Sequence, residues 1–198
     1  MIRDRYPDAD VLSQRGHWDE ATRKIVMDRV HNVPPFKFFN DRERQLLEAL
    51  CDRVIPQDHR PPERQVPIAP FIDQRCLHQA IDGFRFEDLP PQELAWRTGL
   101  AGIDEAAHEI YGHGFTELNG KDRDTVLELV RKGDPPGRSW EGMSVDRFWK
   151  AIVLRQIAGI YYAHPFAWDE IGFGGPAYPR GYLALNHGAR EPWEAEER

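Results

Sequence analysis

The sequence contains few of the short motifs by which enzymes are commonly detected. It has no Gly-x-Gly-x-x-Gly, no phosphate-binding Gly-Lys-Ser/Thr loop, no Gly-x-Ser-x-Gly and no Cys-x-x-Cys. Two cysteines, Cys51 and Cys76, are too few for a disulfide scaffold, and we interpret them as reduced core thiols, although a contact between them is conceivable. These absences argue against a redox or hydrolytic enzyme with its own active site.

Long apolar runs and clusters of basic residues are also missing. No stretch of eighteen apolar residues occurs, so no segment is predicted to cross a membrane. The formal net charge is −7 and Lys and Arg are interspersed with acids, which argues against a nucleic-acid partner. The first residues show neither the apolar region nor the twin arginine of an export signal. We therefore expect a cytoplasmic protein, with co-export to the periplasm on a signal-bearing partner as the alternative.

What the sequence does contain is helical periodicity. Apolar residues recur three and four apart near 18–31, 40–55, 68–82 and 91–111, around 126–130, and from 144 to about 163. Asn40 and Glu43 suit a capping box, Gly83 suits a left-handed helix end, and Ser144 suits an N-cap. Gly112 and Gly114 are predicted to end the long helix that begins near residue 91. No alternating run is longer than about four residues, so little supports a strand. The pattern predicts an all-α fold, a single irregular bundle of about five or six helices.

At 198 residues the chain has the length of a single domain, and 40% hydrophobic residues are enough for a core. We expect one domain over 1–198. Within it, 1–17 is predicted to be an extended arm, 18–164 a helical body, and 165–198 a non-helical strap with an acidic tail.

The C-terminal strap is the most unusual part of the sequence. Between Tyr161 and Tyr182, prolines and glycines disfavour an ordinary helix or strand, yet the aromatic content is too high for a flexible linker. We interpret the segment as a rigid docking strap, with Tyr161 and Tyr162 facing inward. The predicted partner-binding residues are Trp168, Ile171, Phe173, Gly174, Gly175, Pro176, Tyr178, Pro179 and Tyr182.

Metal binding is the alternative chemistry. Glu105-Ala-Ala-His108 is one Glu-x-x-His motif, and His113 follows His108 by five residues. A helical metal pair needs spacings of three or four, and a di-iron bundle needs two such motifs. His164, at the end of the last predicted helix, is interpreted as structural. We assign no catalytic, cofactor-binding or metal-binding residue. Docking to a partner is the preferred interpretation.

Two stretches resemble the gluconate 2-dehydrogenase subunit 3 family. The first is residues 38–58, ending in Asp52-Arg-Val-Ile-Pro-Gln-Asp58, followed by 66–73 with its Phe-Ile-Asp73. The second is 159–165 followed by 168–176, with Trp168, Ile171-Gly-Phe173 and Gly175-Pro176. Phe115-Thr-Glu-Leu118 and Trp140 fall between them in the family's order, so the resemblance covers about residues 36–180.

The resemblance implies a non-flavin accessory subunit. In this family, the small chain associates with a large FAD-dependent subunit of the glucose–methanol–choline (GMC) oxidoreductase type. That subunit oxidises sugars, sugar acids or polyols and passes electrons to a cytochrome or another acceptor. The implied role is to stabilise the large subunit, with FAD there and no cofactor here. Two alternatives stay open: a stand-alone metal enzyme using Glu105, His108 and His113, and a maturation chaperone that leaves the finished flavoprotein.

Overall fold

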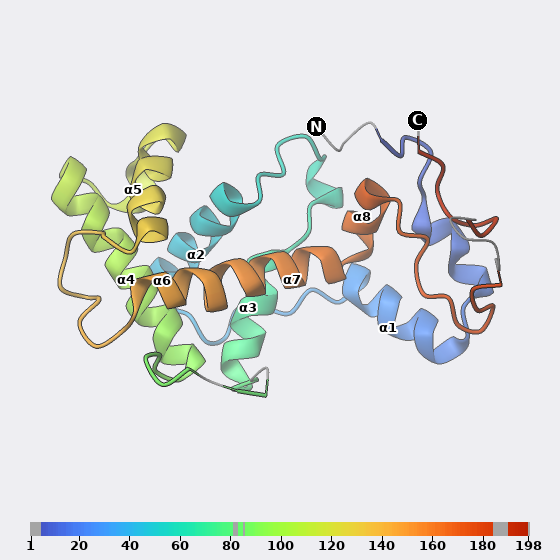
Figure 1. Cartoon of the computed structure of the whole chain (residues 1–198), viewed down its shortest axis with the longest axis horizontal. Coiled ribbons are helices and arrows are strands. Elements are labelled where there is room, and N and C mark those ends of the chain that lie inside the picture. Colours follow the sequence, from blue (N-terminus) through green and yellow to red (C-terminus); the bar gives the residue numbers. More distant parts are fainter. Residues whose placement is uncertain (1–4, 81–82, 85, 184–189, 198) are drawn as a thin grey trace. The chain divides into compact units, whose positions relative to one another are not determined.

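The computed structural model describes residues 5–80, 83–84, 86–183 and 190–197, and all regular secondary structure in these ranges is helical (Figure 1). The predicted all-α fold is confirmed. The α-helices are α1 (Glu20–His31), α2 (Asp41–Val54), α3 (Ile68–Leu77), α4 (Gln92–Tyr111), α5 (Gly120–Lys132), α6 (Val145–Arg147), α7 (Arg155–Ala163) and α8 (Pro165–Trp168). The 3₁₀ turns are η2 (Val11–His17), η3 (Pro62–Arg64), η4 (Phe115–Glu117) and η6 (Asp169–Ile171), and η5 (Phe148–Leu154) is a π-helical segment.

The chain forms two compact units. Pro34–His59 and Pro67–Gly159 form the first, here called the helical unit. Met1–Val33, Arg60–Val66 and Ile160–Arg198 form the second, the terminal unit. We predicted a single domain over 1–198, and the division into two compact units does not test that prediction. Across the described ranges, no helix combines the length and the apolar character that crossing a membrane requires.

The helical unit is built around α4. Helix α2 packs against α3, α4 and α5, and α4 also contacts α3, α5 and η5. The largest fully buried side chains of this unit are Leu47, Leu50, Ile72, Trp96, Leu100, Ile103, Phe115, Val126, Val130, Phe148, Val153 and Ile157. Cys51 and Cys76 are buried free thiols, as predicted, and burial raises the pKa of Cys76 to about 12.

Two glycines let aromatic rings approach α4 closely. A Cβ atom at Gly99 would overlap the ring of Phe148, and one at Gly102 would overlap the indole of Trp140. The Phe148 ring in turn meets the Trp96 ring edge-on, with centroids 5.8 Å apart. The absence of a side chain at these two glycines therefore lets the aromatic rings pack directly against the backbone of α4.

Several helix ends follow the sequence signals. Asn40 and Glu43 form the predicted capping box, and Ser144 accepts a hydrogen bond from the Arg147 N–H. Gly112 and Gly133 end α4 and α5 in the left-handed conformation.

The end of α3 differs from the prediction. The helix stops at Leu77 rather than near 82, and Asp82 lies outside the described residues. The Ala80 N–H donates to the Arg75 carbonyl and the Gln79 N–H to the Cys76 carbonyl, which is a Schellman motif with Gln79 at φ +49°. The sequence predicts Gly83 as the left-handed cap, but Gln79 takes that position four residues earlier.

A buried carboxylate ties α3 to the segment before α2. Asp73 is fully buried and accepts hydrogen bonds from three consecutive backbone N–H groups, those of Lys37 (2.8 Å), Phe38 (3.0 Å) and Phe39 (2.9 Å). These donors precede the capped start of α2, so one side chain aligns two helices.

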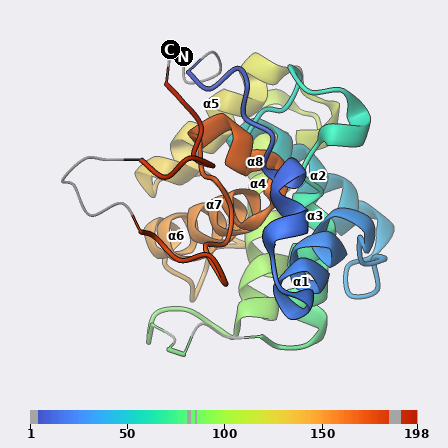
Figure 2. The same cartoon turned by 90° about the vertical axis from the view of Figure 1, so that its right-hand side faces the viewer.

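The terminal unit corrects two predictions. Residues 11–17 form the 3₁₀ helix η2, so 1–17 is not simply an extended arm. Residues 165–171 form α8 and η6, so the non-helical part of the strap begins only at Gly172. Pro165 is compatible with helix because it occupies the first turn, where its missing N–H would have no partner. Figure 2 shows η2, in blue, beside the C-terminal segment, in red.

Candidate partner-binding surface

The candidate surface begins where α7 ends and α8 starts. His164 caps α8, because its Nδ1 accepts a hydrogen bond from the Phe166 N–H (3.2 Å). The other ring nitrogen, Nε2, lies 2.9 Å from the Arg29 carbonyl of α1 and donates to it. His164 is therefore structural, as predicted, and its neutral imidazole is held between two backbone groups.

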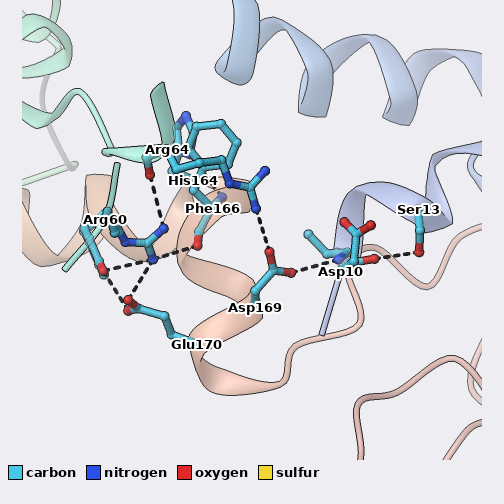
Figure 3. A network of polar contacts seen from close by, with 10 residues as sticks. Asp10, Ser13, Arg60, Arg64, His164, Phe166, Asp169 and Glu170 are labelled. Atoms are coloured by element: carbon cyan, nitrogen blue, oxygen red, sulfur yellow. Dashed lines mark hydrogen bonds and ion pairs between the residues drawn. The ribbon is translucent and has the colours of Figure 1, made fainter. Parts of the chain in front are cut away.

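A buried arginine braces the turn after α8 (Figure 3). The Arg60 side chain is only 8% exposed and its Nη2 lies 2.8 Å from the Glu170 carboxylate. It also donates to the Phe166 carbonyl (2.8 Å) and to the Tyr161 hydroxyl oxygen (3.3 Å). The Tyr161 O–H donates to Glu170 (2.7 Å), and burial together with this bond raises the pKa of Tyr161 to about 12.

A second ion pair links the same turn to the N-terminal segment. The Asp169 carboxylate accepts from the Arg64 guanidinium (3.1 Å) and from the Val11 N–H at the start of η2 (2.8 Å). Burial raises the pKa of Asp169, while these two donors act in the opposite direction. Arg64 also lies 4.3 Å from the centre of the Phe166 ring. Residues 60–66 thus hold α8 and η6 from one side.

Beneath the surface lies a small apolar core. Trp168 packs with Val11, Trp18 and Val26, and its indole N–H donates to the Tyr162 carbonyl (2.8 Å). Gly175 has φ +83°, and a Cβ there would lie 2.8 Å from the Val11 side chain. The backbone of the strap therefore rests directly on this core.

The predicted partner-binding residues divide into supporting and exposed sets. Trp168 is 6% exposed, and Gly174 and Gly175 are buried, so these three support the segment from within. Pro176 is half-buried and Pro179 exposed. Four of the predicted residues are exposed, with exposed fractions of 41% for Ile171, 39% for Phe173, 65% for Tyr178 and 57% for Tyr182. Leu183, the next residue in the chain, is also exposed. We call Ile171, Phe173, Tyr178, Tyr182 and Leu183 the aromatic surface. Of the two tyrosines expected inside, Tyr161 is buried, whereas Tyr162 is 47% exposed, so the prediction for Tyr162 was wrong.

Residues near the C-terminus complete the support. The Trp193 ring lies 6.3 Å from that of Tyr182, and the Arg180 guanidinium lies 4.2 Å above Trp193. Arg180 also donates to Gln14 (3.0 Å). A depression of about 370 Å³ lies between the N-terminal segment, Phe173 and the chain near Trp193, and its walls carry acidic side chains. The acidic tail thus contributes to the edge of the aromatic surface.

The residues of the metal alternative have other contacts. Glu105 accepts from the Ser139 N–H (2.8 Å), which lowers its pKa, and His108 Nδ1 lies 2.9 Å from the Asp104 carbonyl. Among the residues that the structure describes, no three or more His, Cys, Asp or Glu side chains are grouped so as to hold a metal ion.

Replacement of His164 by asparagine is expected to flatten the pH dependence of stability. Burial lowers the His164 pKa to about 4, so the unfolded chain takes up this proton near pH 6.5 while the folded chain does not. The stabilisation is complete above pH 6.5 and is lost as the pH falls, by about 3 kcal/mol at pH 4. An asparagine at this position can still cap α8 but does not titrate. Urea unfolding of both proteins between pH 4 and pH 7 tests this, and parallel pH profiles would refute it.

Comparison with known proteins places the chain in a family. The model of the gluconate 2-dehydrogenase subunit 3 family matches residues 41–175, from the start of α2 to Gly175, which is well over half of the chain. The chain belongs to the gluconate 2-dehydrogenase subunit 3 family. Family membership indicates an accessory subunit of a dehydrogenase complex. Searches of curated proteins and of solved structures found no match.

The matched range of the gluconate 2-dehydrogenase subunit 3 family includes part of the aromatic surface. Ile171 and Phe173 fall inside it, whereas Tyr178, Tyr182 and Leu183 lie beyond its end. The bracing residues Arg60 and Glu170 lie within it, yet sequence reasoning missed them. No local pattern marks them, because 110 positions separate them in the chain and only the fold brings them together.

Proposed function

We propose that this chain is the non-catalytic small subunit that binds and stabilises a large FAD-dependent GMC-type oxidoreductase acting on a sugar, sugar acid or polyol. The large subunit would hold the FAD, carry out the oxidation and pass electrons to a cytochrome or another acceptor. The observation that carries the proposal is the aromatic surface, which is exposed although its backbone is firmly held. Membership of the family supports a partner within a dehydrogenase complex.

Physical chemistry supports a docking role for this surface. Tyr and Phe are enriched at the centres of protein interfaces, where they bury large areas at low entropic cost. Tyr178 and Tyr182 are more than half exposed and Phe173 packs edge-on against Trp168, with ring centroids 5.2 Å apart. Because residues 166–175 are already held by the contacts of Arg60, Asp169 and Gly175, little conformational entropy is lost in this part of the segment when a partner binds.

The test is co-expression with the flavoprotein encoded nearest to this chain, followed by affinity purification. We expect a stable one-to-one complex that contains FAD. The double replacement Tyr178→Asp and Tyr182→Asp should weaken the complex about 100-fold, because two exposed aromatic contacts are each replaced by a desolvated charge. Ile25→Asp is the matched control, since Ile25 is exposed on α1 outside the aromatic surface; it should leave binding unchanged.

Circular dichroism shows whether the variants keep their helices. Equal binding by the double variant and the wild type would disprove docking at this surface. Failure to recover any flavoprotein would disprove the accessory role itself. A third outcome is a flavoprotein that becomes active only when co-expressed with this chain but is purified without it. That outcome would identify the chain as a maturation chaperone.

A further inference from the structure

A cavity in the helical unit is separate from the aromatic surface. It has a volume of about 430 Å³ and lies among the end of α3, the segment before α4, the first turn of α4 and the junction of η5 with α7. Its walls are mainly apolar and aromatic, including Phe84, Phe86, Leu89 and Ile152. This volume and lining are typical of sites for small organic molecules. The π-helical segment η5 contributes Ala151 and Ile152, and such segments are frequent at functional sites.

A buried amide side chain forms part of the cavity wall. Gln156 is only 5% exposed, and its Oε1 accepts a hydrogen bond from the Trp96 indole N–H (3.0 Å). An indole nitrogen can only donate, so this bond fixes the amide with its oxygen toward Trp96 and its NH₂ group turned away. The side chain lines the cavity, and the described residues supply no acceptor for that NH₂ group. The NH₂ group is accessible from the cavity, so a ligand that lies there can accept a hydrogen bond from it through an oxygen atom.

Other polar groups line the same cavity. The buried Nε2 of Gln92 lies beside the Cys76 thiol rather than an oxygen acceptor. Helix α4 has twenty residues and starts at the cavity with Pro91 as N-cap, so no side chain caps its first N–H groups. The Arg155 guanidinium lies at the rim, 5.4 Å from the centre of the Phe84 ring. Among the described residues of the lining, Glu93 alone carries a carboxylate.

We propose that this cavity binds a small carboxylic acid with an apolar, preferably aromatic, body. The carboxylate would accept from the Gln156 amide, and the start of α4 favours negative charge. The apolar body would lie against Phe84, Phe86 and Ile152. A neutral ligand would satisfy the amide but would gain no charge–dipole stabilisation from the helix start. This inference is independent of the proposed function, because the cavity and the aromatic surface share no residue.

The probe is para-trifluoromethyl-phenylacetate, titrated into the full chain, or into its complex with the flavoprotein, and followed by fluorine NMR. We expect saturable binding with a Kd of about 1 mM, as the size of the probe suggests. The corresponding neutral amide should bind at least about 10-fold more weakly. Absence of saturable binding, or equal affinity for the acid and its amide, would overturn the proposal.

Two variants locate the binding. Gln156→Glu keeps an oxygen for Trp96 but replaces the NH₂ donor with a second oxygen, and should weaken acid binding at least 10-fold. Gln45→Glu makes the same change at an exposed position of α2 and should leave the Kd unaltered. If Gln156→Glu does not fold, as judged by tryptophan fluorescence, Ala151→Phe tests the site by filling the cavity. Unchanged affinity in the folded variant would refute binding at this cavity.

Discussion

Replacement of Arg60 by methionine is expected to lower the free energy of unfolding of the terminal unit by about 3–5 kcal/mol. This is the usual cost of removing one partner from a buried ion pair, because the other group then loses the opposite charge beside it. Here the Glu170 carboxylate would lose its partner at 2.8 Å, and the Phe166 carbonyl and Tyr161 hydroxyl would each lose a donor. Urea unfolding followed by tryptophan fluorescence measures the loss, since Trp18 and Trp168 lie in the core of this unit.

Arg64→Met is the matched control. Arg64 is more exposed than Arg60 and forms its ion pair with Asp169, so its loss should cost about 1 kcal/mol or less. Adding Glu170→Gln to Arg60→Met should recover part of the lost stability, because the carboxylate charge that Arg60 faced is then removed as well. Equal effects of the Arg60 and Arg64 replacements would contradict the bracing role assigned to Arg60.

Replacement of Asp73 by alanine is expected to destabilise the helical unit by about 3–5 kcal/mol. The change leaves three neighbouring backbone N–H groups, those of Lys37, Phe38 and Phe39, without their acceptor. Each unsatisfied buried group costs about 1–3 kcal/mol, and partial access of water to the two half-buried donors reduces the sum. Chemical denaturation gives the change in the free energy of unfolding.

Asp73→Asn provides the graded comparison. The amide keeps one oxygen for these donors and should lose about half as much stability as alanine does. If alanine and asparagine cost the same, or if alanine costs less than about 1 kcal/mol, the three hydrogen bonds are not what aligns α3 with the start of α2.

The sequence predicted those parts of the fold that depend on local chemistry. Asn40 and Glu43 form a capping box because both partners lie within one turn, and Gly112 ends α4 because glycine adopts positive φ without strain. The end of α3 was not predictable in this way, since Gln79 carries no signal for the left-handed conformation. Helix η2 was missed for a different reason: its first N–H is held by Asp169, 158 positions away.

The candidate surface was predictable in composition but not in arrangement. High aromatic content between Tyr161 and Tyr182 indicated a packed segment, yet could not tell buried Trp168 from exposed Tyr178. That distinction depends on which side of the backbone meets Val11 and Trp18, and both come from the other end of the chain. Sequence periodicity also failed here, because an irregular backbone has no fixed repeat of inward and outward positions.

The hydrogen bonds of Asp169 and Arg60 connect three stretches that are remote in the chain. A ligand that binds only the C-terminal stretch therefore shifts the folding equilibrium of all three stretches. If it binds only the folded form, it stabilises that form by RT ln(1 + [L]/Kd). The apparent stability of the terminal unit therefore depends on the concentration of a binding partner, just as it depends on temperature. Under the proposed function, cells that make too little of the large subunit would hold a larger fraction of this chain with residues 11–31 and 60–66 open to proteases.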